Sequence, residues 1–317
     1  MTSSSPTLSG IHHVTAITAD AQKNLDFYCG VLGLRLVKLT VNFDDPKSYH
    51  LYYGDELGRP GTIMTFFAWP GGNPGHVGPP QVTATSFAVP KGAKAFWSER
   101  LAKSNVTALP VTERFGEEVL SFTDPDGMEL EIIATENPGG QPWSAGPVPS
   151  ESAIRGFHSV TISEEGYERT ARLLADVMGY RSDQSEGNRF RYCTENSDGL
   201  ATRVDLICAP DARRGRMGAG VVHHVAFRTP DDPQQGEWRR QIADIGFNVS
   251  PVMDRNYFHS IYFREPGGVL FEIATDTPGF TFDEAPEELG TKLKLPQQYE
   301  SARARIEDAL PPLRLPG

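Results

Sequence analysis

The amino-acid sequence predicts an α+β protein built from four βαβββ modules, each a strand and a helix followed by three more strands. Three observations support this prediction. The chain repeats itself, each repeat shows the same order of strand and helix patterns, and 317 residues are enough for two domains of ordinary size. The composition, 38% hydrophobic and 22% charged, is that of a globular protein. We therefore expect two domains of two modules each, followed by a helical tail.

The internal repeat consists of two families of matching segments. GIHHVT at residues 10–15 matches GFHSVT at residues 156–161, an offset of 146. Residues 82–90 match residues 222–230 at an offset of 140, and further matches near these spacings extend both families. Separated segments that match in the same order indicate duplication of a structural unit rather than chance.

Each module is expected to begin with an alternating strand, as at residues 13–17, and to continue with a helix. In the first module Asp20 is placed to cap that helix. The apolar positions of the helix recur at helical spacing: Leu25, Tyr28, Cys29 and Leu32. Gly33 then marks a turn, and further strands follow, including residues 61–69.

The boundaries follow from a stretch rich in Pro, Gly and Ser between the two halves. We predict an N-terminal domain at residues 8–136, a linker at 137–152, a C-terminal domain at 153–280 and a tail at 281–317. Within the tail, residues 297–310 are expected to form an amphipathic helix.

Composition and charge exclude several kinds of partner. The net charge of −11 repels phosphate backbones and anionic lipids, so we expect no nucleic acid and no membrane partner. No apolar run approaches the ~20 residues that a membrane-spanning helix needs. The first ten residues lack the basic and apolar regions of a signal peptide. The three cysteines show no CxxC spacing, which favours reduced thiols and a cytoplasmic location. A homo-oligomer is left open.

The histidines and one glutamate form the candidate metal site. Four of the eight histidines occur as adjacent pairs, His12-His13 and His223-His224, at the openings of the first and fourth modules. Glu272 lies in an otherwise apolar strand, where a carboxylate is costly unless a cation or strong donors neutralise it. Two imidazoles and one carboxylate form a facial triad with open positions, which suits non-haem Fe(II) and O₂ chemistry.

A single strand histidine is more often a hydrogen-bonded structural residue than a ligand, so the repeat serves as an internal control. The other two modules carry Ser159 in place of His13 and Ala84 in place of His224, whereas Glu131 stands in place of Glu272. One carboxylate without the histidines should not hold a divalent metal. The sequence therefore predicts one working site and one vestigial site.

The motifs GIHHVT, HHVAF, RNYFHSIYF, LFEIATD, LKLPQQYE and IEDALPPL extend over nearly the whole chain. With the four-module pattern, they resemble the vicinal oxygen chelate superfamily of glyoxalases, fosfomycin-resistance proteins and extradiol dioxygenases. Within that superfamily, the chain looks like the ring-cleaving dioxygenases that act on hydroquinones. The resemblance implies the vicinal oxygen chelate fold, with His13, His224 and Glu272 as metal ligands. It places His12, His223, Arg255 and Tyr262 around the metal as catalytic or substrate-contacting groups.

We accordingly expect an Fe(II)-dependent ring-cleaving dioxygenase that uses O₂ and a small aromatic diol of the hydroquinone or catechol type. The same ligands also accept Mn(II). We expect His223 to act as acid and base, His12 to orient the substrate or oxygen, and Arg255 and Tyr262 to stabilise negative charge. The alternatives are a glyoxalase-type isomerase or thiol-transferring lyase with a redox-silent metal, and a non-catalytic small-molecule-binding protein. The sequence assigns no role to the loop Arg213–Arg216 or to His259.

Overall fold

The computed structural model of the chain describes residues 7–195 and 199–315, and these form the four predicted βαβββ modules. The first contains β1 (Ile11–Thr18), α1 (Ala21–Leu25), β2 (Arg35–Asn42), β3 (Asp45–Gly54) and β4 (Ile63–Ala68). The second contains β5 (Gln81–Pro90), α2 (Lys94–Lys103), β6 (Thr112–Arg114), β7 (Glu117–Thr123) and β8 (Glu129–Thr135). The third contains β9 (Gly156–Glu164), α3 (Glu168–Arg172), β10 (Arg181–Glu186), β11 (Arg189–Cys193) and β12 (Arg203–Cys208). The fourth contains β13 (Val222–Thr229), α4 (Asp232–Asp244), β14 (Met253–Asp254), β15 (Phe258–Arg264) and β16 (Leu270–Pro278).

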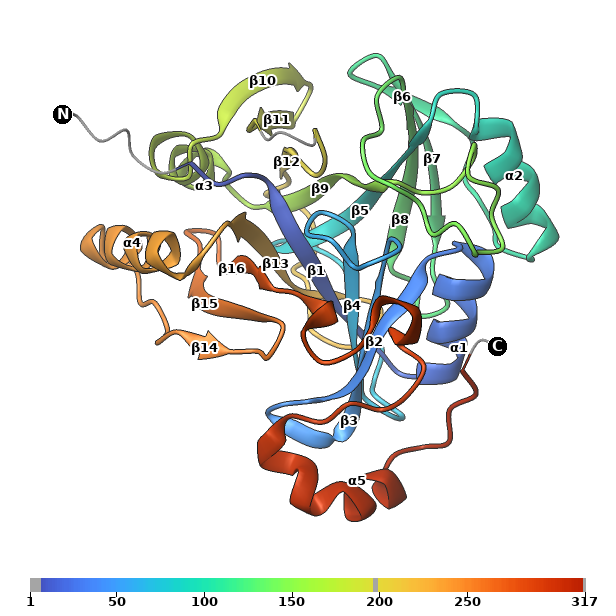
Figure 1. Cartoon of the computed structure of the whole chain (residues 1–317). Helices are drawn as coiled ribbons and strands as arrows, with labels where there is room; N and C mark the ends of the chain where they lie inside the picture. Colours follow the sequence, from blue (N-terminus) through green and yellow to red (C-terminus); the bar gives the residue numbers. More distant parts are fainter. Residues whose placement is uncertain (1–6, 196–198, 316–317) are drawn as a thin grey trace.

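The strands form two eight-stranded sheets, each of which combines two modules (Figure 1). The first sheet has the order β14-β15-β16-β13-β1-β4-β3-β2 and joins the first module to the fourth. The second has the order β10-β11-β12-β9-β5-β8-β7-β6 and joins the second module to the third. Each sheet thus takes one module from each half of the chain. The segment 137–152 separates the repeats along the sequence without separating the two sheets.

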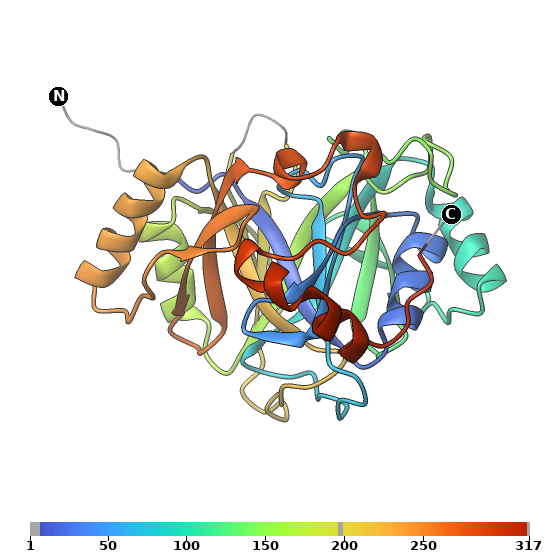
Figure 2. The same cartoon turned by 60° about the horizontal axis from the view of Figure 1, so that its bottom comes forward.

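Helices α1 and α2 lie at one end of the molecule and α3 and α4 at the other (Figure 1 and Figure 2). Asp20 caps α1 as predicted, because its side chain accepts hydrogen bonds from the backbone N–H groups of Gln22 and Lys23. A π-helical turn at Asp26–Val31 continues α1. Trp97 on α2 and Trp238 on α4 are fully buried, so these helices pack firmly against the sheets.

The central pair of the first sheet, β1 and β13, contains two β-bulges. The register moves from Ile11–Phe227 to His13–Ala226, which leaves His12 as an extra residue. It shifts again at the other end of the pair, where His223 is the extra residue between the partners of Thr15 and Ala16. A bulge re-aims side chains, so both members of a histidine pair can lie near one site although strand neighbours ordinarily point to opposite faces.

The C-terminal segment runs against the first sheet (Figure 2). It contains 3-10 turns at Phe280–Phe282, Pro286–Glu288 and Gln297–Ala302 and the helix α5 (Arg303–Ala309), which together confirm the helical tail. Lys38 on β2 is fully buried and bonds to Asp283 and Glu284 of this segment. A cation so deeply buried is stable only when it is paired, so this contact fixes the segment to the sheet.

The cysteines and the helices of the structure can be compared with the predictions made from the composition. All three cysteines are free. Within residues 7–195 and 199–315, no helix is both long and apolar enough to span a bilayer. Residues 1–6 of the segment that lacks signal-peptide features lie outside the described residues.

Candidate metal centre

Three side chains from neighbouring strands converge on one point in the first sheet. His13 is on β1, His224 on β13 and Glu272 on β16, and all three are buried. The Nε2 atoms of the two histidines lie 3.3 Å apart. Glu272 Oε2 lies 2.9 Å from His224 Nε2 and 3.3 Å from His13 Nε2. Among the described residues, this is the one group of three such side chains whose donor atoms are close enough to hold a metal ion.

The donor atoms of this group are suited to a divalent metal. Glu272 Oε2 is buried and accepts no hydrogen bond of good geometry, whereas its Oε1 accepts one from Ser260. Three atoms with lone pairs therefore face one another at short range, an arrangement that is unfavourable unless a cation lies between them. Imidazole and carboxylate are ordinary ligands of iron and manganese. The residues fit the metal that the resemblance implies.

The hydrogen bonds of His12 set the tautomer of His13. His12 Nε2 lies 3.1 Å from the backbone oxygen of Thr275, which can only accept, so a neutral His12 carries its proton there. Its Nδ1 then accepts from His13 Nδ1 at 2.9 Å, which leaves His13 Nε2 free to bind a metal. Burial lowers the pKa of His12 well below its usual value, in keeping with the neutral ring.

His223 and His224 repeat this arrangement, with their Nδ1 atoms 2.8 Å apart. When His224 binds a metal through Nε2, its Nδ1 proton is donated to His223 Nδ1. His223 then carries its own proton at Nε2. Burial, with a contribution from His224, lowers the pKa of His223 to about 3, so this ring is neutral. His223 is thus held as a hydrogen-bond donor beside the metal site.

Next to the three donor atoms lies a cavity of about 350 Å³. Among the predicted site residues, His13, His223, His224, Arg255 and Tyr262 line it. The rest of its wall is largely aromatic or apolar: Phe43, Tyr52, Phe67, Trp69, Phe258 and Leu270. A mostly apolar cavity with a few polar groups is typical of a small-molecule site.

Arg255 and Tyr262 meet at the side of this cavity. Arg255 Nε donates to the Tyr262 hydroxyl at 3.2 Å, and Arg255 also lies 3.5 Å from Asp44 across the cavity mouth. Tyr262 is the strand partner of Glu272, which places its hydroxyl on the metal side of the cavity. Burial raises the pKa of Tyr262, and Glu272 raises it further. Tyr262 therefore remains a neutral hydroxyl.

The structure places other candidates away from the cavity. His12 lies behind His13 and does not line the cavity, so its contact is with the ligand His13 rather than with a substrate. His259 pairs with Asp232 on the outside of the fourth module. The loop Arg213–Arg216 packs against the connection between the first two modules, where the backbone of Arg216 exchanges hydrogen bonds with that of His76.

Sequence reasoning missed two residues of the cavity wall, His50 and Tyr52 on β3. Both are buried, and the Tyr52 hydroxyl lies 2.9 Å from His50 Nδ1. The strand register aligns β3 with β11, where Arg189 and Arg191 occupy these two positions. A comparison of the repeats strand by strand, rather than at one offset, would have shown that both residues differ between the first sheet, which carries the histidine pairs, and the second.

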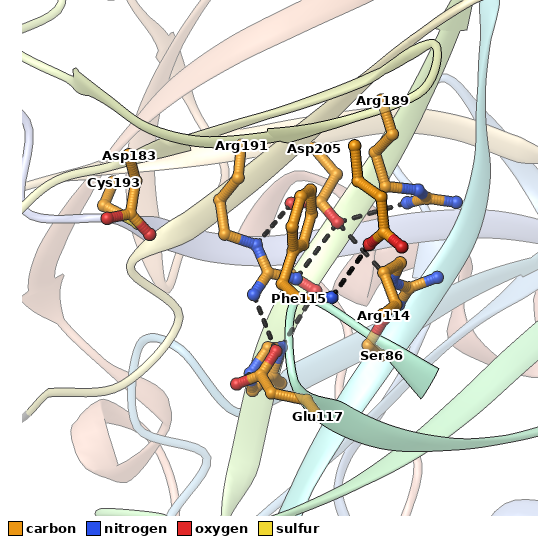
Figure 3. A network of polar contacts seen from close by, with 12 residues as sticks. Ser86, Arg114, Phe115, Glu117, Asp183, Arg189, Arg191, Cys193 and Asp205 are labelled. Atoms are coloured by element: carbon orange, nitrogen blue, oxygen red, sulfur yellow. Dashed lines mark hydrogen bonds and ion pairs between the residues drawn. The ribbon is translucent and has the colours of Figure 1, made fainter. Parts of the chain in front are cut away.

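The equivalent place in the second sheet is filled by an ion-pair cluster (Figure 3). Arg114 contacts both carboxylate oxygens of Glu131, at 2.9 and 2.6 Å. Beside them, Asp205 accepts hydrogen bonds from Arg189 and Arg191. Burial raises the pKa of Glu131, but Arg114 and the Ser86 hydroxyl outweigh burial and hold it below its usual value. In the second sheet, the Arg114 guanidinium neutralises Glu131, whereas the equivalent Glu272 of the first sheet faces two histidines.

Comparisons with known proteins agree with this geometry. The model of the Glyoxalase/Bleomycin resistance protein/Dioxygenase superfamily matches residues 10–132 and 156–273. A Bacillus subtilis protein named as a ring-cleaving dioxygenase, MhqO, is 51% identical over 96% of this chain and 97% of its own length. Chlorohydroquinone/hydroquinone 1,2-dioxygenase of Sphingobium indicum is 40% identical over 94% of this chain and 95% of its own length.

A crystal structure of a Bacillus subtilis protein named as a dioxygenase superposes on this chain with a TM-score of 0.94. It is 50% identical, and the superposition covers 98% of this chain and 99% of that one. Four modules in two sheets, a buried His-His-Glu group beside an aromatic cavity, and full-length relatives named for ring cleavage lead to one conclusion: the chain belongs to the glyoxalase/bleomycin resistance protein/dioxygenase superfamily, among its ring-cleaving dioxygenases.

Proposed function

We propose that the protein is an Fe(II)-dependent dioxygenase that uses O₂ to open the ring of a small aromatic diol of the hydroquinone or catechol type. The observation that carries this proposal is the convergence of His13, His224 and Glu272 beside a cavity of about 350 Å³. These three residues would hold a metal beside the cavity, where a substrate could reach it. The relative named for chlorohydroquinone and hydroquinone supports the substrate class.

Iron bound by these ligands would supply open positions at which a phenolate and O₂ meet and through which electrons pass between them. The protein supplies the orientation of the ligands. His12 holds the proton of His13 at Nδ1, and His223 does the same for His224, so both Nε2 lone pairs face the site. Ser260 holds the other oxygen of Glu272, which aims Oε2 at the same point.

The remaining residues handle charge and protons. His223 lines the cavity, and its Nε2–H can donate a hydrogen bond to an oxygen that develops negative charge. Arg255 carries the positive charge nearest to the Tyr262 hydroxyl, and both groups can stabilise a phenolate. The aromatic walls exclude water and pack against the ring of the substrate. We propose His223, Arg255 and Tyr262 as catalytic residues and His12 as a positioning residue.

The test uses the internal repeat as its control. Glu272→Ala should abolish iron binding, whereas Glu131→Ala should retain it, because Glu131 is bonded to Arg114 instead of facing histidines. Iron content is measured on both purified variants, and oxygen uptake is recorded with hydroquinone and catechol. Equal iron retention would contradict the site. An iron-loaded wild type that consumes no oxygen with either diol would contradict the reaction and favour an isomerase or lyase.

A further inference from the structure

On β3 and the neighbouring β4, the structure has a buried chain of neutral hydrogen-bonding groups beside the cavity. The Tyr52 hydroxyl bonds to His50 Nδ1 at 2.9 Å, and His50 Nε2 bonds to the hydroxyl of Thr65. All three side chains are buried, and His50 and Tyr52 line the cavity. The mechanism proposed above uses the ring of Tyr52 as part of the aromatic wall but gives no role to these hydrogen-bonding groups.

The chain leaves one hydrogen-bonding position of Tyr52 open. Both ring nitrogens of His50 are used, one by Tyr52 and one by Thr65. If Tyr52 donates to His50, its oxygen can still accept a hydrogen bond; if His50 donates, the Tyr52 proton is free to be donated. Burial lowers the pKa of His50 well below its usual value, so the ring stays neutral in either case. In the described residues, the Tyr52 hydroxyl has no hydrogen-bond partner besides His50.

The other polar groups of the cavity are less suited to accept a hydrogen bond from a substrate hydroxyl. His223 and Arg255 can only donate once their present partners are counted. Asn42 accepts from the backbone of Asp44, and Asp44 itself is exposed at the mouth beside Arg255. Thr15 follows His13 by two residues on β1 and so lies at the metal end of the cavity.

The position of Tyr52 in the sheet suits the far side of a ring. The ligand strands are consecutive, β16, β13 and β1, and β3 lies beyond β4, two strands from His13. Two strand spacings amount to roughly 10 Å along the sheet. The second hydroxyl of a para-diol points away from the metal, whereas the second hydroxyl of an ortho-diol lies next to the first.

The repeat shows that these groups accompany the metal ligands. At the positions of His50 and Tyr52 the second sheet has Arg189 and Arg191, which bond to Asp205. Because these arginines donate their hydrogen bonds to Asp205, they do not provide the neutral hydrogen-bonding groups that β3 has. Between these two equivalent strands, β3 and β11, the neutral chain belongs to the one in the sheet that carries the histidine pairs.

We propose that Tyr52, positioned by His50 and Thr65, binds the hydroxyl of the diol that is remote from the metal and thereby selects para-diols. This inference rests on the proposed function, because it needs one substrate oxygen at the metal site. Tyr52 is the residue in contact with the substrate, and His50 acts through Tyr52 as a positioning residue.

The experiment measures equilibrium binding to the iron-loaded protein without oxygen, so that no turnover occurs. Trp69 lines the cavity, and its fluorescence reports occupancy. The probes are hydroquinone, catechol and 4-methylphenol, the last of similar size to hydroquinone but without the second hydroxyl. Tyr52→Phe removes only the proposed contact. Tyr53→Phe is the matched control, because Tyr53 is an equally buried neighbour whose hydroxyl bonds to Asn24 on the other face of the strand.

Tyr52→Phe should weaken hydroquinone binding roughly three- to tenfold, the effect of one neutral hydrogen bond, and leave catechol and 4-methylphenol unchanged. Tyr53→Phe should change none of the three. His50→Phe should reproduce part of the hydroquinone effect, and His50→Gln should restore it, because an amide can accept from Tyr52 and donate to Thr65.

The outcomes separate this inference from the proposed function. If the wild type binds hydroquinone and Tyr52→Phe binds it equally well, the contact is wrong while the function stands. An equal loss of all three probes in Tyr52→Phe also overturns the contact, because it would indicate a general change of cavity shape. A wild type that binds none of the probes overturns the proposed function and the contact with it.

Discussion

The ion-pair cluster of the second sheet yields a quantitative prediction. Arg114→Met removes the guanidinium that contacts both oxygens of Glu131 and replaces it with an apolar side chain of similar length. The side chain of Glu131 is 3% exposed, so the variant leaves a carboxylate in the interior with the Ser86 hydroxyl as its remaining hydrogen-bond partner among the described residues. The proposed iron site lies in the other sheet and should be unaffected.

The magnitude follows from burial. Removing one partner of a buried ion pair typically costs about 3–5 kcal/mol, because the other charge stays desolvated and unpaired. We therefore expect Arg114→Met to lower the free energy of unfolding by that amount. Arg181→Met is the matched control, because Arg181 and its partner Glu195 are 71% and 83% exposed. An exposed pair of this kind contributes about 0–1 kcal/mol.

The dependence on pH provides a second signature. In the wild type, Arg114 holds the pKa of Glu131 below its usual value, so the stabilisation is present at neutral pH and is lost as the pH falls through that lowered pKa. In Arg114→Met the largest opposition to burial is gone and the Ser86 hydroxyl remains, so the pKa of Glu131 should rise. Protonating Glu131 then relieves the variant, and its deficit relative to the wild type should shrink on acidification.

The assay is equilibrium urea unfolding, followed through tryptophan fluorescence. One of the tryptophans is the buried Trp97 on α2, the helix that packs against the same sheet. The double variant Arg114→Met/Glu131→Gln removes the stranded charge and should recover most of the lost stability. The reasoning is refuted if Arg114→Met costs no more than Arg181→Met, or if the double variant is less stable than Arg114→Met alone. Iron content should match the wild type in every variant.

Three further predictions concern the metal ligands, the buried acids and the tail. His223→Ala should retain iron but lose about 10²–10⁴-fold in kcat, whereas His224→Ala should lose the iron. Iron analysis and oxygen uptake measure these two effects. The reverse pattern would mean that the pair is assigned the wrong way round. Burial raises the pKa of Glu164 to about 8, so the stability of the wild type should fall as the pH rises toward that value. The urea midpoint of Glu164→Gln should not show this dependence on pH. An unchanged dependence would rule out Glu164 as its source. Lys38→Met should lower the free energy of unfolding in urea by about 3–5 kcal/mol and expose the C-terminal segment to protease. Lys292→Met, which breaks a half-exposed pair, should do neither. Equal effects of the two variants would show that the buried contact does not hold the segment.

The modules and the three candidate metal ligands could be picked out from the sequence because both are local properties. The order of strand and helix patterns repeats along the chain, and a carboxylate such as Glu272 within an apolar strand is visible as a cost that needs an explanation. The loss of both histidines at Ser159 and Ala84 identified the two modules that carry the donor group. The equivalence of repeated positions therefore carried most of the information about the site.

Only the tertiary structure decided which groups face one another. The histidine pairs implied that the first and fourth modules meet, and the structure shows how they do so: β1 pairs with β13 at the centre of the first sheet. The bulges at His12 and His223 turn each pair so that one ring orients the other, which the alternation of an ideal strand does not predict. Tyr52 faces the cavity and Arg114 faces Glu131 because the strands of each sheet curl around an interior. Such contacts depend on the register and curvature of whole sheets, which no local pattern of residues specifies.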